Sequence, residues 1–199
     1  MTYDRVDVFG HSILGNAADF CPVENGNQII EFHAFPGGQA YDIVNSMMVC
    51  ARSRLQLELR TVFGIHVLQN TVAQTNGWSH TDMVEFRTYV RNFFVEEMNL
   101  YHGWFFILLD RPPELEHLFG NIRMIKDQLR VEAGASMLPP CNPGKVLERW
   151  RRKGKYEIQN WRWREAENGV GPGYHPSNKS MYNYVRYIRR FVEHQFRRC

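Results

Sequence analysis

The sequence predicts a three-layer α/β fold, in which a mainly parallel, doubly wound sheet of four to five strands carries helices on both faces. Short β-branched or aromatic runs end at Gly or Pro residues, and between them apolar residues recur at helical spacing. Strands that alternate with helices are typical of such a sheet. With 199 residues, 44% of them hydrophobic, the chain is long enough for one sizeable core, so we expect a single domain over residues 1–199.

The first two strands are expected at Tyr3–Phe9 and Gln28–Phe35. The first alternates weakly and ends at Gly10, and the second ends at Pro36 and the two glycines after it, so turn residues close both strands. A helix is predicted after Gly38. Its apolar residues recur every three or four positions, at Tyr41, Ile43, Val44, Met47, Met48 and Ala51.

A third, buried strand is predicted at Val62–Leu68, which is apolar and rich in β-branched residues. Ser79 and Asp82 are spaced to begin the next helix, and Gly103 is expected to end it. The apolar residues of this helix recur with a period of 3.6 residues, at Met83, Phe86, Val90, Phe93, Phe94 and Met98.

The continuous apolar run Trp104–Leu109 predicts a central strand of a parallel sheet, and a further helix is expected to reach about Ala133. Residues 134–173 receive no assignment. A last helix follows Pro176, with Ser177 as its expected cap. One face of this helix carries Met181, Val185, Ile188 and Val192, and the other carries Arg186, Arg190, His194 and Arg197.

Charge is unevenly distributed along the chain. Residues 1–143 carry 10 Lys/Arg and 16 Asp/Glu, a net charge of −6, whereas residues 144–199 carry 14 Lys/Arg and 5 Asp/Glu, a net charge of +9. A strongly basic quarter is typical of contact with nucleic acid or an anionic surface, and it is also what a solvated helix face carries.

Several protein classes are excluded by simple features. No run of ~18 uncharged apolar residues is present to cross a bilayer. Met1–Phe9 lacks the basic, apolar and small-residue order of a signal peptide. The cysteines Cys21, Cys50, Cys141 and Cys199 form no Cys-x-x-Cys pair, and no histidine lies at metal-ligand spacing, so we expect reduced, structural thiols. The chain is thus predicted to be cytoplasmic, without a metal or a cofactor.

Two short segments carry a catalytic hypothesis. In an open parallel sheet, functional groups gather at the carboxyl ends of the strands, and Ser12 follows the first expected strand. His175 precedes the last helix, so the fold can bring it to the same edge as a base for the serine. A hydroxyl and an imidazole in this arrangement predict nucleophilic attack on an ester. The simpler interpretation is that Ser12 stabilises the turn and His175 begins the helix.

These segments resemble the sequence blocks of the SGNH (GDSL-type) hydrolase family. The run Gly-His-Ser-Ile-Leu at Gly10–Leu14 is similar to its Gly-Asp-Ser-Leu block, Gly38 stands where its second-block glycine follows strand two, and Gly173–Pro176 is similar to its Asp-x-x-His block. The resemblance covers nearly the whole chain in block order. It implies an acyl hydrolase with Ser12 as nucleophile, His175 as base and the N–H groups of Ser12 and Gly38 as oxyanion hole.

The departures from the family bear directly on catalysis. Pro172 stands where the family has the acid that orients its histidine, and it cannot accept a hydrogen bond through its side chain. His11 replaces the aspartate of the first block. In the third block, whether Asn70 or Asn76 supplies the oxyanion asparagine is open. Loss of an oxyanion donor typically costs ~10²–10³ in rate, and loss of the correct imidazole orientation can cost ~10⁴. We therefore expect little or no esterase activity.

The basic quarter, residues 144–199, then becomes the stronger indication of function. It interleaves cationic groups with tryptophan and tyrosine rings, which suits single-stranded RNA because cations neutralise phosphates and rings stack on bases. The same tryptophans also suit core packing, with the charges reaching solvent. The expected RNA-binding residues are Arg149, Arg151, Arg152, Lys153, Arg162, Arg164, Arg186, Arg189 and Arg190, with a smaller group of Arg52, Arg54 and Arg60.

Three hypotheses follow. The leading one is a non-catalytic or barely catalytic SGNH-like domain that binds RNA. It agrees with a further resemblance, in length, block order and arginine richness, to an SGNH-like domain of an insect germ-plasm protein that binds RNA. That resemblance implies mRNA partners, a germline role and assembly with other proteins. The rival is a serine esterase that uses Ser12 and His175, and the third is a protein-interaction scaffold.

Overall fold

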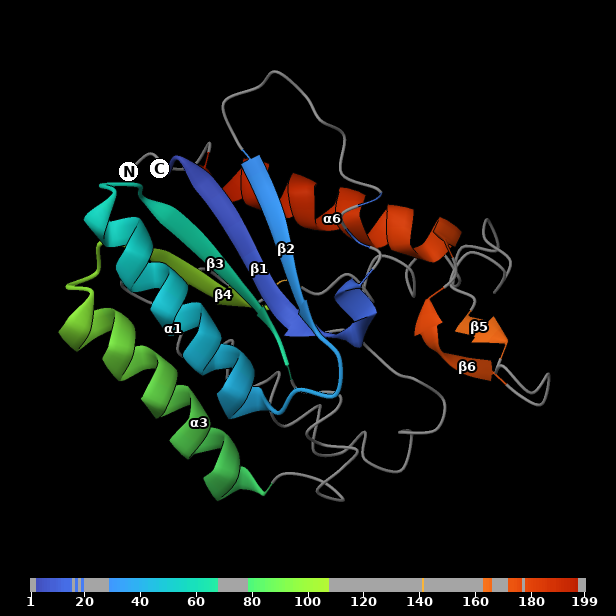
Figure 1. The fold of residues 1–199 in the computed structure, drawn as a ribbon, viewed down its shortest axis with the longest axis horizontal. Coiled ribbons are helices and arrows are strands. Elements are labelled where there is room, and N and C mark those ends of the chain that lie inside the picture. The colour runs from blue at the N-terminus through green and yellow to red at the C-terminus, as the bar shows by residue number, and fades with distance from the viewer. Residues whose placement is uncertain are drawn as a thin grey trace.

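A four-stranded parallel sheet forms the centre of the molecule in the computed structural model (Figure 1). The structure describes residues 3–15, 17, 19, 29–67, 79–107, 141, 163–165, 172–176 and 178–196, and it describes 163–165 and 172–176 by their backbone. The strand order is β2-β1-β3-β4. The strands are β1 (Arg5–His11), β2 (Ile29–Phe35), β3 (Thr61–His66) and β4 (Gly103–Phe106).

The register of the sheet follows from its apolar sequence. Val6 of β1 pairs with Ile30 of β2 and with Val62 of β3, and every residue of β3 is buried. Such continuous burial is expected for strands covered on both faces. A parallel bridge between Ile107 and Cys141 continues the sheet beyond β4, in agreement with the predicted four to five strands.

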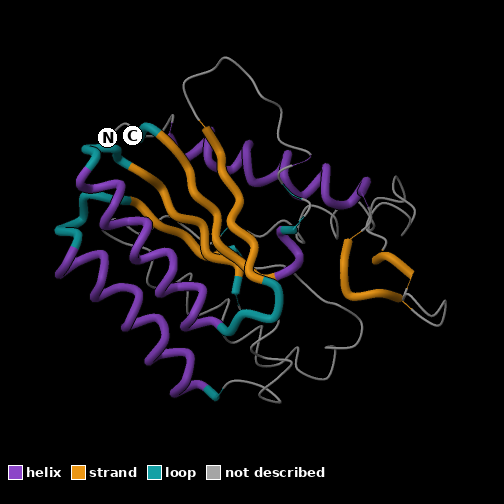
Figure 2. The backbone as a smooth tube through the Cα atoms, viewed as in Figure 1, coloured by secondary structure: helices purple, strands orange, loops and turns teal. Residues whose placement is uncertain are grey.

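Helices cover both faces of this sheet, as Figure 2 shows. The helices α1 (Ala40–Gln56) and α3 (His80–Asn92) lie on one face, and α6 (Asn178–Phe196) lies on the other. The core on the first face includes Phe9 and Phe63, and the core on the second includes Val8 and Tyr184. The predicted three-layer architecture is therefore confirmed.

The start of α3 is set by the predicted Ser79. Its hydroxyl accepts a hydrogen bond from the Asp82 N–H at 3.1 Å, and the Asp82 carboxylate accepts one from the Ser79 N–H at 2.8 Å. This reciprocal capping satisfies donors that a helix leaves without intrahelical partners. The end of the helix differs from the prediction. The α-helix stops at Asn92, and a π-helical turn, η3 (Phe93–Glu97), follows while Phe93 stays buried.

A small antiparallel hairpin was not predicted. It consists of β5 (Trp163–Glu165) and β6 (Pro172–Pro176), and it begins within the segment that received no assignment and extends beyond it to Pro176. The helix expected to reach about Ala133 lies outside the described residues, as does the cap residue Ser177. No described helix combines the length and apolar character needed to cross a membrane.

Candidate functional site

The carboxyl edge of the sheet carries the predicted nucleophile. Ser12 begins the short 3-10 helix η1 (Ser12–Leu14), directly after β1. The chain winds toward β2 on one side of β1 and toward β3 on the other, and ligands of open α/β sheets bind at such a switch point. Gly10 is required here, because a Cβ at this position would lie 2.6 Å from the carbonyl oxygen of His66.

The segment that carries His175 reaches this same edge. Its strand β6 contacts η1, although the two elements are some 160 residues apart in the sequence. Figure 1 shows the β5–β6 hairpin beyond η1, on the side of the sheet that α6 covers. The fold thus brings the backbone segments that contain Ser12 and His175 close together.

The other predicted groups of the catalytic hypothesis fit less well. Gly38 lies just after β2, but its N–H donates a hydrogen bond to the carbonyl oxygen of Phe35 at 3.0 Å. In this conformation the N–H is used within the turn, so it is not directed at an oxyanion. Asn70 lies outside the described residues.

The hairpin register adds an acid that sequence reasoning missed. Pro172, which stands at the position of the family's orienting acid, is the Cα partner of Glu165 across the hairpin. The pairing is irregular between Trp163 and Glu165. The register places Glu165 opposite Pro172, which precedes His175 by three residues. No sequence motif links Glu165 to His175, so sequence reasoning could not find it.

A buried aromatic cluster at the same edge was also missed. The rings of His11 and His66, at the ends of β1 and β3, lie 5.0 Å apart. The Tyr184 hydroxyl, from α6, lies 2.7 Å from His66 Nδ1. Burial, and then the charge of Cys141, raises the pKa of Tyr184 well above its ordinary value, so the phenol keeps its proton and can donate a hydrogen bond to His66 Nδ1. The cluster joins α6 to the carboxyl edge of the sheet.

The outer face of α6 carries an exposed basic stripe. We define the α6 stripe as Tyr182, Arg186, Arg190 and His194, which recur every four residues and are all exposed. At 1.5 Å per residue, the stripe is ~18 Å long. The opposite face is buried against the sheet and includes the predicted residues Met181, Val185, Ile188 and Val192.

The described acid nearest to the α6 stripe in the sequence is already neutralised. Glu193 accepts a hydrogen bond from Arg189 Nε at 3.0 Å, one helical turn away. Arg189, which the sequence also predicted to bind RNA, is therefore engaged within the helix. Among the described residues of α6, Arg186 and Arg190 thus provide the exposed guanidinium groups.

Most of the remaining basic residues predicted to bind RNA cannot be placed. Arg164 belongs to β5, which contributes backbone only. The predicted residues outside the described part of the chain are Arg149, Arg151, Arg152, Lys153 and Arg162.

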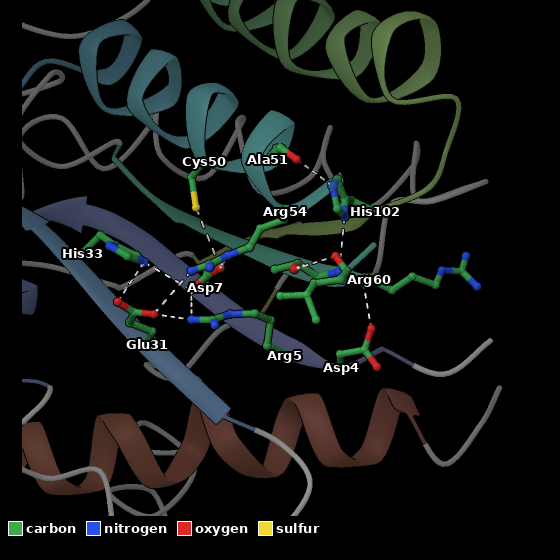
Figure 3. A network of polar contacts seen from close by, with 12 residues as sticks. Asp4, Arg5, Asp7, Glu31, His33, Cys50, Ala51, Arg54, Arg60 and His102 are labelled. Carbon is green, nitrogen blue, oxygen red and sulfur yellow. Dashed lines mark hydrogen bonds and ion pairs between the residues drawn. The ribbon is translucent and has the colours of Figure 1, made fainter. Parts of the chain in front are cut away.

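The smaller predicted group, Arg52, Arg54 and Arg60, is engaged in contacts within the chain, and Figure 3 shows the contact of Arg54 with Asp7. The Arg54 side chain is 17% exposed, and its Nε donates to Asp7 at 3.0 Å. Arg60 Nε donates to the carbonyl oxygen of Tyr101 at 3.2 Å. Arg52 forms an ion pair with Glu97. These contacts give all three arginines a role within the fold.

The position of this group also separates it from the α6 stripe. Arg52 and Arg54 lie on α1, whereas Arg190 lies on α6, across the sheet. The layers of the fold therefore keep Arg52 and Arg54 apart from the exposed arginines of α6.

Asp7 is the centre of the polar network in Figure 3. Burial alone would raise the pKa of its carboxyl, but contacts from His33 and Arg54 together with the charge of Arg5 lower it below its ordinary value. Glu31 adds a second carboxylate that Arg5 contacts. The network lies toward the amino ends of the strands, away from Ser12, and it ties β1, β2 and α1 together.

Three members of the network have the residue types of a metal site. The ligand atoms of Asp7, Glu31 and His33 lie within 4.8 Å of one another. However, Arg5 and Arg54 both contact the two carboxylates, and their positive charges take the place a cation would fill. The two guanidinium groups compensate the buried carboxylate, so the removal of one partner is expected to destabilise the fold. The cluster therefore gives no support to a metal ion.

Comparison with known proteins supports the fold but not a particular activity. Neither protein-family models nor curated protein sequences match the chain. Among similar solved structures is a candidate acylhydrolase from Bacteroides fragilis, with a TM-score of 0.60 and 13% identity over 97% of this chain and 88% of that chain. A GDSL-like lipase from Bacteroides thetaiotaomicron has a TM-score of 0.61 and 14% identity over 96% and 89%.

A third similar structure is the C-terminal catalytic domain of peptidoglycan O-acetyltransferase A from Streptococcus pneumoniae, with a methylsulfonyl adduct. Its TM-score is 0.60, with 11% identity over 97% of this chain and 94% of that chain. At these identities the likeness concerns the fold. The chain therefore has an SGNH hydrolase-like fold, as its sequence blocks predicted.

Proposed function

We propose that this chain is a non-catalytic or barely catalytic SGNH-like domain that binds RNA. The observation that carries the proposal is the α6 stripe, which places Arg186, Arg190 and His194 in line with Tyr182 on an exposed helix face. Tyr182 is 50% exposed, so its ring is accessible to an unpaired base.

The chemistry of the α6 stripe suits single-stranded RNA. Guanidinium groups neutralise phosphates and release counterions, and an aromatic ring stacks on a base without selecting its identity. The helix is held firmly for this task, because Tyr184 and Val185 are buried against the sheet. RNA is therefore expected to lie along the outer surface of α6 and to contact both arginines.

The state of the candidate catalytic edge agrees with this proposal. Pro172 cannot orient an imidazole, and the Gly38 N–H is already bonded to Phe35. The resemblance to the C-terminal domain of the insect germ-plasm protein Oskar, which is understood to bind RNA rather than hydrolyse esters, points the same way. We extend the proposal on that basis to mRNA as the partner and the cytoplasm as the location.

Charge reversal on α6 tests the proposal. The variant Arg186→Glu/Arg190→Glu is compared with Arg52→Glu/Arg91→Glu by fluorescence anisotropy with a labelled single-stranded RNA. Arg91 is exposed on α3, and Arg52 is exposed on α1, so the control makes the same change in net charge across the sheet. Circular dichroism spectra establish that both variants are folded.

The expected result is a loss of affinity of more than about a hundredfold for the α6 variant, because two charge-assisted contacts of about 1.5–3 kcal/mol each are replaced by repulsion. The control is expected to bind within a few-fold of the wild type. Equal losses in the two variants would mean that net charge alone attracts RNA, and the α6 stripe would have no special role.

A second candidate function, acyl-ester hydrolysis, is favoured by one specific observation. The strand of His175 contacts the 3-10 turn of Ser12, which is the backbone arrangement that a serine–histidine pair requires. In this candidate, Ser12 attacks the ester, His175 accepts its proton, and Glu165 is the acid best placed by register to replace Pro172.

Hydrolysis of p-nitrophenyl acetate tests this second candidate. Turnover that is lost in Ser12→Ala and is strongly reduced in Glu165→Gln would establish an active site with a relocated acid. Ser46→Ala is the matched control, because Ser46 lies on α1 and its hydroxyl donates to the carbonyl oxygen of Asp42. Equal rates in wild type and Ser12→Ala would exclude the serine as nucleophile.

A further inference from the structure

A groove on the face opposite to α6 has a chemistry of its own. It lies between α1 and the α3–η3 segment and encloses about 310 Å³. Asn45 and Val49 of α1 line one side, and Tyr89 and Phe93 line the other. At one end the lining consists of Arg52, Glu96 and Glu97. A volume of this size admits a large side chain from outside but not a folded element.

The walls of the groove are apolar and aromatic. Tyr89 and Val49 are 40% and 66% exposed, so both side chains are accessible to a partner. The Tyr89 hydroxyl donates to Asn45 Oδ1 at 2.6 Å, and its ring packs against Tyr41 at 5.5 Å. These contacts hold the Tyr89 ring in place, so the wall is preformed.

The end of the groove is acidic. The α3–η3 segment contains Asp82, Glu85, Glu96 and Glu97 against Arg87 and Arg91. Within the described part of the chain, Arg52 contacts Glu97, while Glu96 is exposed and forms no ion pair.

Arg52 shows how this surface receives a guanidinium group. Its guanidinium carbon lies 5.2 Å from the centre of the Phe93 ring, and its Nε donates to Glu97 at 3.1 Å. An aromatic face and a carboxylate therefore hold one arginine already. Tyr89 and Glu96 also line the groove, and they offer an aromatic ring and a carboxylate to a second arginine from outside the chain.

We propose that the groove between α1 and α3–η3 is a docking site for an arginine side chain of a partner protein. The guanidinium binds Glu96 and the aromatic wall, and apolar residues of the same partner segment cover Val49. This site is independent of the proposed RNA contact on α6, and its carboxylates repel phosphates. An arginine-bearing polypeptide therefore fits the groove, whereas RNA does not.

The test uses a fluorescein-labelled heptapeptide of alternating leucine and arginine, titrated with the full chain. The matched probe carries citrulline in place of each arginine, which keeps the shape of the side chain and removes its charge. The variant Glu96→Lys is compared with Glu85→Lys, because Glu85 is exposed on α3 but does not line the groove. The variant Arg186→Glu/Arg190→Glu tests whether the peptide site is separate from α6.

The proposal predicts at least tenfold tighter binding of the arginine peptide than of the citrulline peptide, a contrast of the size expected for a charge-assisted hydrogen bond. Glu96→Lys is expected to remove most of this difference, Glu85→Lys to change it less than threefold, and the α6 variant to leave it intact. Equal binding of the two peptides, or equal effects of the two lysine variants, would overturn the proposal. Self-association of the protein that Glu96→Lys abolishes would instead identify a second copy as the occupant and would also overturn it.

Discussion

The hydroxyl of Tyr184 lies 2.7 Å from Nδ1 of His66, although 118 residues separate the two in the sequence. Both side chains are fully buried. This contact fixes α6 against the carboxyl end of β3, and α6 carries the α6 stripe on its other face. The helix that carries the proposed binding surface is thus joined to the carboxyl edge of the sheet by a buried polar contact.

Removal of this contact is expected to destabilise the fold. Tyr184→Phe leaves His66 Nδ1 without the Tyr184 hydroxyl in a buried site, at a cost of about 1–3 kcal/mol in the free energy of unfolding. Urea denaturation followed by circular dichroism measures this change. Tyr182→Phe, on the exposed side of the same helix, should cost less than about 0.5 kcal/mol. Equal costs would show that the buried hydroxyl contributes nothing specific.

Asp7→Asn is expected to be among the most damaging single changes on the α1 face. It removes a buried carboxylate that Arg5 and Arg54 contact, and breaking such a pair typically costs on the order of 3 kcal/mol. Asp42→Asn is the matched control, because Asp42 is exposed in the first turn of α1. Urea denaturation at neutral pH gives both values, and similar values would contradict the role of the network.

The lowered pKa of Asp7 also predicts how stability changes with pH. Because the folded state holds this carboxyl at a lower pKa than the unfolded state, its contribution is fully present above the ordinary carboxyl value of ~3.9. The contribution is lost as the pH falls through the lowered pKa. The acid-induced loss of stability should therefore be smaller in Asp7→Asn than in wild type. If the free energy of unfolding fell equally in the two proteins from pH 5 to pH 2, the prediction would be wrong.

Gly10→Ala is expected to disrupt the edge that carries Ser12. The new Cβ would lie 2.6 Å from the His66 carbonyl oxygen and 2.7 Å from Leu14 Cδ1, so the backbones of β1 and β3 must separate. Overpacking of this kind typically costs about 1–3 kcal/mol. Gly15→Ala, at an exposed position with a helical φ of −53°, is the comparison. The midpoint of thermal unfolding is measured for both variants. If both midpoints equal that of the wild type, the strands accommodate the methyl group and the prediction is wrong.

Tyr182→Ala is expected to weaken RNA binding by a different route from the arginine variants. Loss of one stacked base costs about 1–3 kcal/mol by alanine substitution, but it removes no charge. Affinity should therefore fall while the dependence on salt stays the same. Tyr182→Phe keeps the ring and should bind as the wild type does. If Tyr182→Phe lost as much RNA affinity as Tyr182→Ala, the effect would belong to the hydroxyl and not to the ring.

The strands and helices could be predicted where burial leaves a periodic pattern. Ile43, Val44, Met47, Met48 and Ala51 of α1 are all buried, as their spacing required. Tyr41 fits the same period but is 41% exposed, because its ring packs beside the exposed ring of Tyr89. The hairpin of β5 and β6 was missed because its strands are short and lie among glycines and prolines.

The candidate site was predicted only in part, because its geometry depends on pairs that are distant in the sequence. The block order correctly placed Ser12 after β1, and β6 reaches the same edge. No local pattern could indicate that Arg54 faces Asp7, 47 residues away, and so binds within the fold. The pairing of Glu165 with Pro172 likewise appears only in the hairpin register.

The most direct test of the central claim is the salt dependence of RNA binding by the wild type and by Arg186→Gln/Arg190→Gln. Anisotropy titrations across a salt series give the slope of log affinity against log salt concentration. Each phosphate neutralised on a single strand contributes ~0.7 to this slope, so the variant should lose ~1.4 from it. A steep wild-type slope that falls by this amount would establish that α6 binds RNA through these two arginines. A flat slope, or equal slopes in the two proteins, would contradict the account.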